Sequence, residues 1–246
     1  MGEGLDVWLI PLVGERPPAM DHILSPDERA RAGRFAGETL RDRFVCGRAA
    51  MRLLLGQSLG VDPQGLVFTY GAAGKPALAG EPGLHFNLAH SHELAVLAVT
   101  RLAPVGIDIE WCRPLPDRDA VARRFFAQTE SAALAALPEE QRDAAFYAGW
   151  TRKEAYLKAV GTGLSQDLDG FCVELRPARP AGLLSIGGDF RAARGWTIAD
   201  LPLPEGYRGA CAVPATAPQM RVVPFTWGSF SVSGSSATGL PTGMIS

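Results

Sequence analysis

Hydrophobic and polar residues first alternate along the chain and then change to a helical spacing. Residues 5–13, LDVWLIPLV, are rich in β-formers and predict a strand. The run SPDE at 25–28 predicts the start of a helix, because Ser25 can cap the first turn and the Glu three positions later completes a capping box. A second helix, ended by Gly60, is expected over residues 41–59, and its apolar face carries Phe44, Val45, Ala49, Leu53 and Leu54.

The rest of the chain repeats this order of strand, helices and strands. Further strands are expected at 66–70, 84–88, 94–100, 105–111, 171–175, 196–199 and 209–213. Further helices are expected at 120–126, at 130–137, and from Pro138 to about Val160, where Gly161 and Gly163 stop the last of them. Segregated helices and hairpin-like strands favour an α+β fold over a doubly wound parallel sheet.

The repeated order divides the chain into two halves. We expect an N-terminal half over residues 1–104 and a C-terminal half over residues 105–227. Residues 228–246 carry no charge and are rich in Ser, Gly and Thr, so they are expected to be a disordered tail or a segment foreign to the native chain.

Composition and charge exclude several classes of protein. The 246 residues have a net charge of −2, which argues against a general nucleic-acid binder. No apolar run is long enough for a membrane helix, and the first residues lack the features of a secretory signal. The four cysteines are widely separated without CxxC spacing, so we expect reduced thiols in a cytoplasmic protein rather than a zinc site or disulfides.

The segment GIDIE at 106–110 places two carboxylates on one side of a predicted strand. Asp108 and Glu110 face the same way because side chains alternate along a strand. Two neighbouring carboxylates repel each other unless a cation lies between them, and oxygen ligands of this kind suit Mg²⁺. The simpler alternative is a half-exposed strand with two solvated acids.

The lysines are the second unusual feature. Of the 24 basic residues only three are Lys, and two of these, Lys153 and Lys158, lie in WTRKEAYLK at 150–158. Trp150, Glu154 and Lys158 share one helix face, which makes Glu154 a candidate metal ligand or general base. An ordinary helix salt bridge from Glu154 to Lys158 is the alternative.

Three features of the N-terminal half favour an anionic ligand. Lys75 lies in the turn GKP at 74–76, and FNLAHS at 86–91 offers backbone N–H groups and an imidazole. Residues 29–52 contain seven Arg against two acids, which suits a polyphosphate or an acidic protein partner. A solvated helix face is the alternative for the arginines.

Together these segments resemble the phosphopantetheinyl transferases of the Sfp type. The motifs GKP, FNLAHS, GIDIE and WTRKEAYLK occur in that family's order and spacing, and the resemblance covers roughly residues 5–227. It implies two similar α/β halves related by a pseudo-twofold axis, with the active site in the cleft between them. It also implies transfer of the phosphopantetheine arm of coenzyme A to a serine of an acyl or peptidyl carrier protein, with release of 3',5'-ADP.

The resemblance also implies roles for individual residues. Asp108, Glu110 and Glu154 would hold Mg²⁺, with Glu154 and Lys158 as the catalytic residues. Coenzyme A, the co-substrate, would be bound by Arg31, Arg43, Lys75, His90 and Lys153. The departures are Ala89, where the family usually has Ser, and Glu28, where some members have a Lys near the ligand.

Partners and rival functions complete the expectations. Carrier proteins are acidic helical bundles, so Arg123, Arg124, Phe125 and Phe126 are expected to contact them. We expect a monomer in polyketide or nonribosomal peptide biosynthesis, without nucleic-acid or membrane partners, and the sequence leaves open whether its carrier is of the polyketide, peptide or fatty-acid kind. A non-catalytic carrier-binding module and a Mg²⁺-dependent phosphohydrolase are the rival functions.

Overall fold

The computed structural model describes residues 4–14, 20–72, 74–81, 83–161, 167–177 and 179–230. The elements of the N-terminal half are β1 (Leu5–Pro11), α1 (Pro26–Ala32), α2 (Glu38–Leu59), β2 (Phe68–Tyr70), β3 (Pro76–Leu78), β4 (His85–Ser91) and β5 (Leu94–Thr100). As predicted, α1 begins at the SPDE run, where the Glu28 carboxylate accepts a hydrogen bond from the Ser25 N–H at 3.0 Å.

The second half begins with the predicted acidic strand. Its elements are β6 (Gly106–Trp111), α3 (Arg118–Phe125), α4 (Gln128–Ala135), α5 (Glu139–Val160), β7 (Phe171–Val173), β8 (Leu183–Ile186), α6 (Phe190–Ala193), β9 (Thr197–Asp200), β10 (Tyr207–Val213) and β11 (Met220–Pro224). The prediction for α5 is confirmed at both ends. Gly161, at a φ of 82°, adopts the left-handed conformation that ends the helix, whereas Gly163 lies outside the described residues.

The two halves have the same strand topology. In the N-terminal half the sheet order is β1-β5-β4, and in the C-terminal half it is β6-β10-β9, with antiparallel pairing throughout both series. Each half also has a two-stranded hairpin, β2–β3 and β7–β8. The prediction of an α+β fold is confirmed, and the strand order repeats, while the pseudo-twofold axis remains a prediction.

The end of the described chain returns to the first half. Strand β11 pairs in parallel with β1, and the ring of Phe230 stacks on that of Phe225 at a centroid distance of 5.3 Å. The C-terminal boundary at residue 227 and the expected tail from residue 228 therefore need correction. Residues 220–230 pack on the N-terminal half, and residues 231–246 lie outside the described residues.

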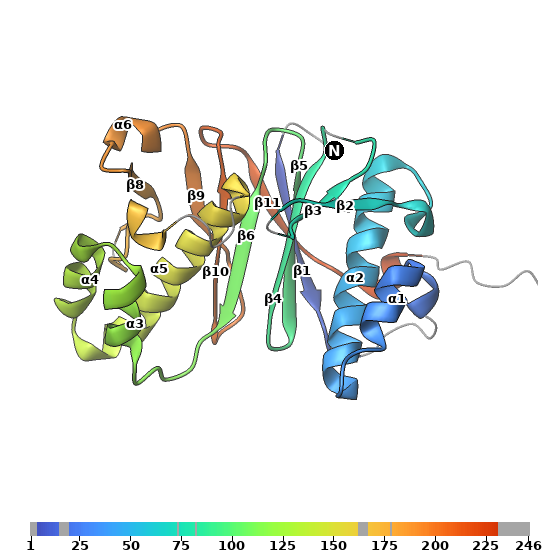
Figure 1. The fold of residues 1–246 in the computed structure, drawn as a ribbon, viewed down its shortest axis with the longest axis horizontal. Coiled ribbons are helices and arrows are strands. Elements are labelled where there is room, and N and C mark those ends of the chain that lie inside the picture. The colour runs from blue at the N-terminus through green and yellow to red at the C-terminus, as the bar shows by residue number, and fades with distance from the viewer. Residues whose placement is uncertain are drawn as a thin grey trace, which may run out of the picture.

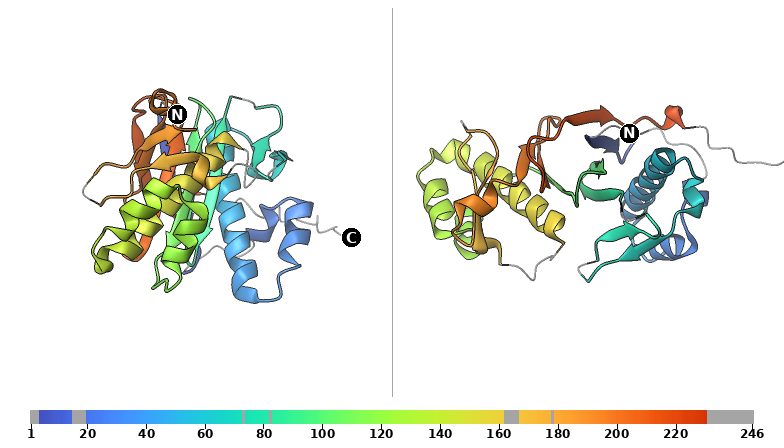
Figure 2. Two further views of the ribbon diagram at one scale, coloured as in Figure 1. Left: turned by 60° about the vertical axis from the view of Figure 1, so that its left-hand side comes forward. Right: turned by 90° about the horizontal axis from the view of Figure 1, so that it is seen from above.

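The described residues form three hydrophobic cores, one in each half and one between them. The first lies between α2 and the N-terminal sheet, and the second lies around α5. The third joins the two sheets through buried side chains of β1, β5 and β6, including Val7, Val96 and Ile107. The long helices α2 and α5, labelled in Figure 1, lie on the same side of the strands, as the right panel of Figure 2 shows. The start of β6 thus lies at the boundary between the halves.

The fold bears on the expected state of the cysteines and on the expected lack of a membrane helix. All four cysteines are described, and none forms a disulfide. Within the described part of the chain, no helix has the length and apolar character needed to cross a bilayer.

Candidate active site

The acidic strand β6 lies unusually close to α5. A Cβ atom added at Gly106 would lie 2.0 Å from the Ala155 carbonyl oxygen and 2.3 Å from the Ala159 nitrogen. Only glycine permits this approach, because any side chain at this position would collide with the helix backbone. The contact brings Asp108 of β6 next to Lys158 of α5.

The Asp108 carboxylate and the Lys158 ammonium form the central ion pair of the site. The Lys158 Nζ donates to Asp108 Oδ1 at 2.5 Å. The second oxygen, Asp108 Oδ2, is buried and has no hydrogen-bond partner among the described residues. Burial raises the pKa of Asp108 to about 7; Lys158 opposes this shift, whereas Glu110 and Glu154 increase it.

The other two acids complete a carboxylate cluster (Asp108, Glu110 and Glu154). Burial raises the pKa of Glu154, Lys158 lowers it and Glu110 raises it further, so these groups interact electrostatically. Glu110 accepts a hydrogen bond from the Ser91 hydroxyl of β4 at 3.1 Å. The cluster therefore lies where β4, β6 and α5 meet.

The three carboxylates do not converge on one metal position. Among the described residues, no three His, Cys, Asp or Glu side chains are arranged to hold a metal ion. Nevertheless, Asp108 Oδ2 lacks a partner among the described residues, and burial, with a smaller contribution from the neighbouring acids, raises the pKa of Asp108. A hard cation would relieve both conditions, so the donor chemistry of the cluster fits Mg²⁺.

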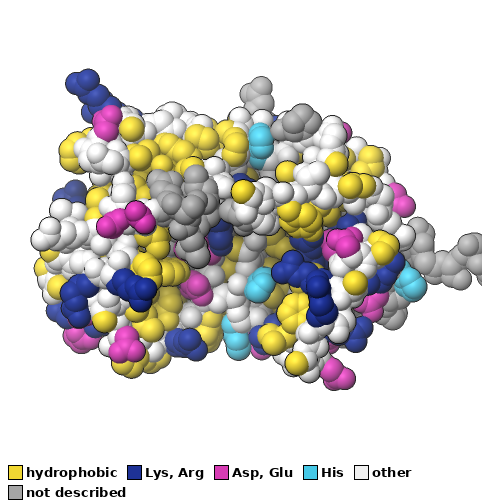
Figure 3. All heavy atoms as spheres, viewed as in Figure 1, with side chains coloured by type: hydrophobic (Ala, Val, Ile, Leu, Met, Phe, Trp, Pro, Cys, Tyr) yellow, Lys and Arg dark blue, Asp and Glu magenta, His cyan; other side chains and the backbone are white. Residues whose placement is uncertain are grey.

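Cationic side chains from the N-terminal half face the cluster. His90 of β4 is exposed; partial loss of hydration, with Lys158 and Arg43, lowers its pKa, while Glu110 opposes the shift and Arg31 adds to it. The Arg43 Nε is buried without a hydrogen-bond partner in the described residues. Figure 3 shows basic and histidine side chains around the recess between the halves. This arrangement favours a ligand with several negative charges.

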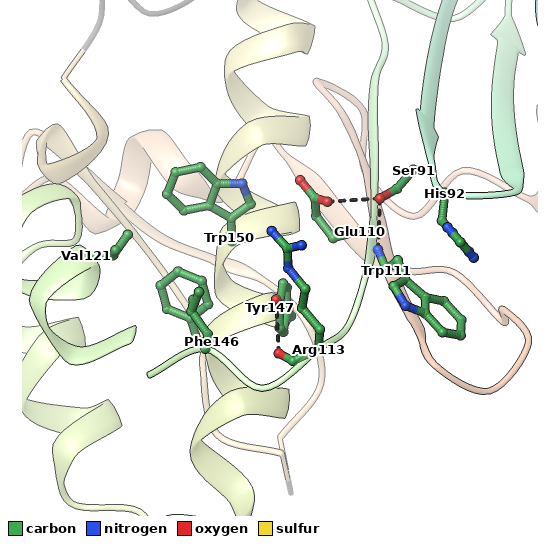
Figure 4. A pocket seen from close by; sticks show the side chains of 10 residues that line it. Ser91, His92, Glu110, Trp111, Arg113, Val121, Phe146, Tyr147 and Trp150 are labelled. Atoms are coloured by element: carbon green, nitrogen blue, oxygen red, sulfur yellow. Dashed lines mark hydrogen bonds between the residues drawn. The ribbon is translucent and has the colours of Figure 1, made fainter. Parts of the chain in front are cut away.

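A partly apolar pocket of about 460 Å³ opens beside Glu110. One wall is formed by Phe146, Tyr147 and Trp150 of α5, and the opposite wall carries His92 and Trp111, whose rings stack at 5.1 Å (Figure 4). The pocket can therefore receive an elongated, partly apolar group whose reactive end lies near the carboxylates.

Lys153 does not lie in this site, which corrects the expectation that it contacts the phosphates. Its ammonium is completely buried, pairs with Glu130 at 2.7 Å and donates to the carbonyl oxygens of Leu168 and Phe171. Burial lowers the pKa of Lys153, and Glu130 opposes this shift. Adjacent helix positions point about 100° apart, so Lys153 faces the C-terminal core while Glu154 faces the cluster.

Lys75 is also placed differently from the expectation. Its ammonium donates to the carbonyl oxygens of Val105 at 2.8 Å and Lys158 at 2.6 Å, and burial lowers its pKa to about 8. The Lys75 ammonium therefore binds the backbone of the C-terminal half. It does not join the group of cationic side chains near His90.

Glu28 is a structural residue and not a ligand-facing replacement for a lysine. Its buried carboxylate is bound by Arg48 at 2.6 Å and Arg52 at 2.5 Å. Two of the seven arginines in residues 29–52 are therefore neutralised inside the N-terminal half. Arg31 remains exposed, with its guanidinium 5.2 Å from the centre of the Phe44 ring.

The expected carrier surface is only partly available. Arg123 and Arg124 are exposed and Phe125 is half-buried. Phe126 is only 3% exposed and stacks on Phe146 at 5.4 Å, so it belongs to the core and cannot contact a partner. Of the four residues expected to contact a carrier, only Arg123, Arg124 and Phe125 are accessible.

The sequence interpretation did not assign roles to two polar residues that bridge the halves. The Asn87 side-chain oxygen accepts from the Ile107 N–H at 2.8 Å, and the Ser91 hydroxyl accepts from the Trp111 N–H at 2.9 Å. Both lie within the FNLAHS segment. An Asn in the middle of an apolar strand was the signal that could have revealed this bridge, because a buried polar side chain needs a hydrogen-bond partner.

Comparisons with known proteins show what the chain is similar to. The 4'-phosphopantetheinyl transferase superfamily matches residues 104–212. The 4'-phosphopantetheinyl transferase HetI of Nostoc sp. is 39% identical over 87% of this chain and 89% of its own. The 4'-phosphopantetheinyl transferase Sfp of Bacillus subtilis is 32% identical over 67% of this chain and 72% of its own. A holo-[acyl-carrier-protein] synthase structure from Thermotoga maritima is 21% identical, with a TM-score of 0.35 over 47% of this chain and 64% of that chain.

Proposed function

Because this chain belongs to the 4'-phosphopantetheinyl transferase superfamily, we propose that it transfers the 4'-phosphopantetheine arm of coenzyme A to a serine of an apo carrier protein. The observation that carries the proposal is the ion pair between Asp108 and Lys158, beside Glu110 and Glu154 and opposite the cations of the N-terminal half. A diphosphate with developing negative charge fits between these groups.

The proposed reaction is a phosphoryl transfer. The carrier serine oxygen forms a bond to the phosphorus that bears the pantetheine arm, and the bond from this phosphorus to the diphosphate bridging oxygen breaks. The products are the holo-carrier and 3',5'-ADP. Such a transition state gathers charge on the phosphate oxygens, so positioning and charge neutralisation supply most of the rate enhancement.

Two residues act on protons and charge in this proposal. Glu154 accepts the serine proton directly or through a water molecule, and its raised pKa suits a general base. Lys158 neutralises the diphosphate and protonates the leaving oxygen. In the structure the Lys158 ammonium already lies 2.5 Å from Asp108, which keeps it at the centre of the cluster.

Asp108, Glu110 and Glu154 are the residues that would hold Mg²⁺. When bound, the ion would neutralise diphosphate charge as a Lewis acid. Support comes from the unpartnered, buried Asp108 Oδ2 and from the pKa of Asp108, which burial raises and the charges of Glu110 and Glu154 raise further.

The N-terminal cations are proposed to bind the nucleotide end of coenzyme A. Burial lowers the pKa of His90, and the charges of Arg43 and Arg31 lower it further, so these three cationic side chains are near enough to share one anionic ligand. Arg123, Arg124 and Phe125 are proposed to contact the acidic carrier. A pseudo-twofold cleft, a monomeric state and a cytoplasmic location remain parts of this proposal.

Mass measurement of an apo carrier tests the function directly. The protein is incubated with coenzyme A, Mg²⁺ and the carrier, and we expect one phosphopantetheine group to be added to the carrier. A carrier whose serine is replaced by alanine is the matched control. An unmodified carrier with intact coenzyme A would indicate a binding module, and consumption of coenzyme A without the carrier would indicate a phosphohydrolase.

A further inference from the structure

The β2–β3 turn of the N-terminal half reaches across to the C-terminal half through one side chain. The Lys75 ammonium donates to the Val105 carbonyl, directly before β6, and to the Lys158 carbonyl in the last turn of α5. One cation therefore connects three elements: the hairpin, the acidic strand and the long helix.

The chemistry of these acceptors explains why a cation is bound there. The last four carbonyl groups of a helix lack intrahelical donors, and the Lys158 carbonyl is one of them. A positive charge is favoured at this end because the helix dipole is negative there. Lys75 thus satisfies an acceptor that α5 itself cannot satisfy.

The same junction fixes two residues of the proposed reaction. Gly106 follows Val105 and lies against α5 without space for a Cβ. Two residues further on, Asp108 pairs with the Lys158 side chain at 2.5 Å. A shift of either backbone segment would change the geometry of this pair.

We propose that Lys75 is a positioning residue that holds the backbone of Lys158 and of β6 in register across the two halves, and that it does not bind the 3'-phosphate of coenzyme A. It acts together with Asn87 and Ser91, whose side chains accept hydrogen bonds from backbone N–H groups of β6. The Asn87 and Ser91 contacts join β4 to β6, which belong to different sheets, and Lys75 ties the residue before β6 to the end of α5.

The inference rests on the proposed transferase function, so the parent enzyme is measured first. Turnover is then compared for Lys75→Met with coenzyme A and with dephospho-coenzyme A, which lacks the 3'-phosphate. Because a charge-assisted contact is lost, we expect kcat to fall about tenfold or more for both substrates in equal proportion. Lys75→Arg, which keeps a cationic donor, should recover part of kcat.

Arg43→Met is the matched control, since it removes a cation proposed to meet the phosphate. It should reduce kcat/KM for coenzyme A more than for dephospho-coenzyme A. A parent enzyme without transfer would refute the proposed function and not the junction alone. With an active parent, a loss confined to coenzyme A in the Lys75 variant, or unchanged turnover, would overturn the positioning role. If Lys75→Met does not fold, the same substrate ratio is read in Lys75→Gln.

Discussion

Replacing Lys153 by Met should destabilise the protein without altering the coenzyme A site. The Lys153 and Glu130 side chains are 0% and 3% exposed, so the substitution leaves a buried carboxylate without its cation. The Glu130 carboxylate keeps two backbone donors, the N–H groups of Ala127 at 2.9 Å and Val173 at 2.7 Å. These two hydrogen bonds compensate only part of the lost charge pairing.

The magnitude follows from this burial. Removing one partner of a buried ion pair costs about 3–5 kcal/mol. For a chain of this length each kcal/mol lowers Tm by about 2–4 °C, so we expect a decrease of about 6–20 °C. Burial raises the pKa of Glu130, and without Lys153 this pKa rises further. The folded variant then binds a proton more tightly than the unfolded chain, so its deficit should shrink as the pH falls from 7 toward about 4.5.

Thermal and urea unfolding, followed by circular dichroism, measure this effect. Glu154→Gln is the matched control on the neighbouring helix position, because it should change turnover with little change in Tm. The KM for coenzyme A should stay within about twofold of the parent in Lys153→Met, since no contact to the site is lost. An unchanged Tm with a strongly raised KM for coenzyme A would refute the structural role and return Lys153 to the phosphate site.

Three further substitutions test separate parts of the account. Arg124→Glu should raise KM for an acidic carrier severalfold without changing Tm. Phe126→Ala should instead cost about 3–5 kcal/mol of stability, because its ring is buried. A raised carrier KM with unchanged Tm in Phe126→Ala would contradict the assignment of Phe126 to the core. Phe230→Ala should lower Tm measurably by removing the stack on Phe225, and an unchanged Tm would restore the expectation that packing ends before residue 228. Gly106→Ala should lower the free energy of unfolding by about 1–3 kcal/mol, because the added methyl group forces β6 away from α5. A variant as stable as the parent would refute the close contact.

Local signals predicted the elements that have strong caps. The SPDE run set the start of α1, and Pro138 with Gly161 set the bounds of α5, because these residues determine backbone conformation within one turn. Strand β11 was not predicted, because its partner β1 lies at the opposite end of the chain. Pairing between such distant segments depends on tertiary contacts that no local pattern contains.

The site was predicted where helix and strand periodicity determine direction. Asp108 and Glu110 share one side of β6, and Glu154 and Lys158 share one face of α5, so the four side chains converge because β6 packs directly against α5 within the C-terminal half. Lys153 was misplaced because its partner Glu130 belongs to α4, and burial by another helix is invisible in the local sequence. The contacts of Lys75 were not predicted for the same reason, since its acceptors are backbone carbonyls of the other half.

Turnover of Glu154→Gln tests the central claim most directly, that the carboxylate cluster with Lys158 is the transfer centre. The variant keeps the size of the side chain but removes its negative charge. We expect it to fold, to bind coenzyme A and to leave the apo carrier unmodified in the mass measurement. Partial rescue by added Mg²⁺ would assign Glu154 mainly to metal binding, and rescue by alkaline pH alone would assign it to proton transfer. Turnover within about threefold of the parent, as an exposed salt bridge to Lys158 would give, would contradict the account.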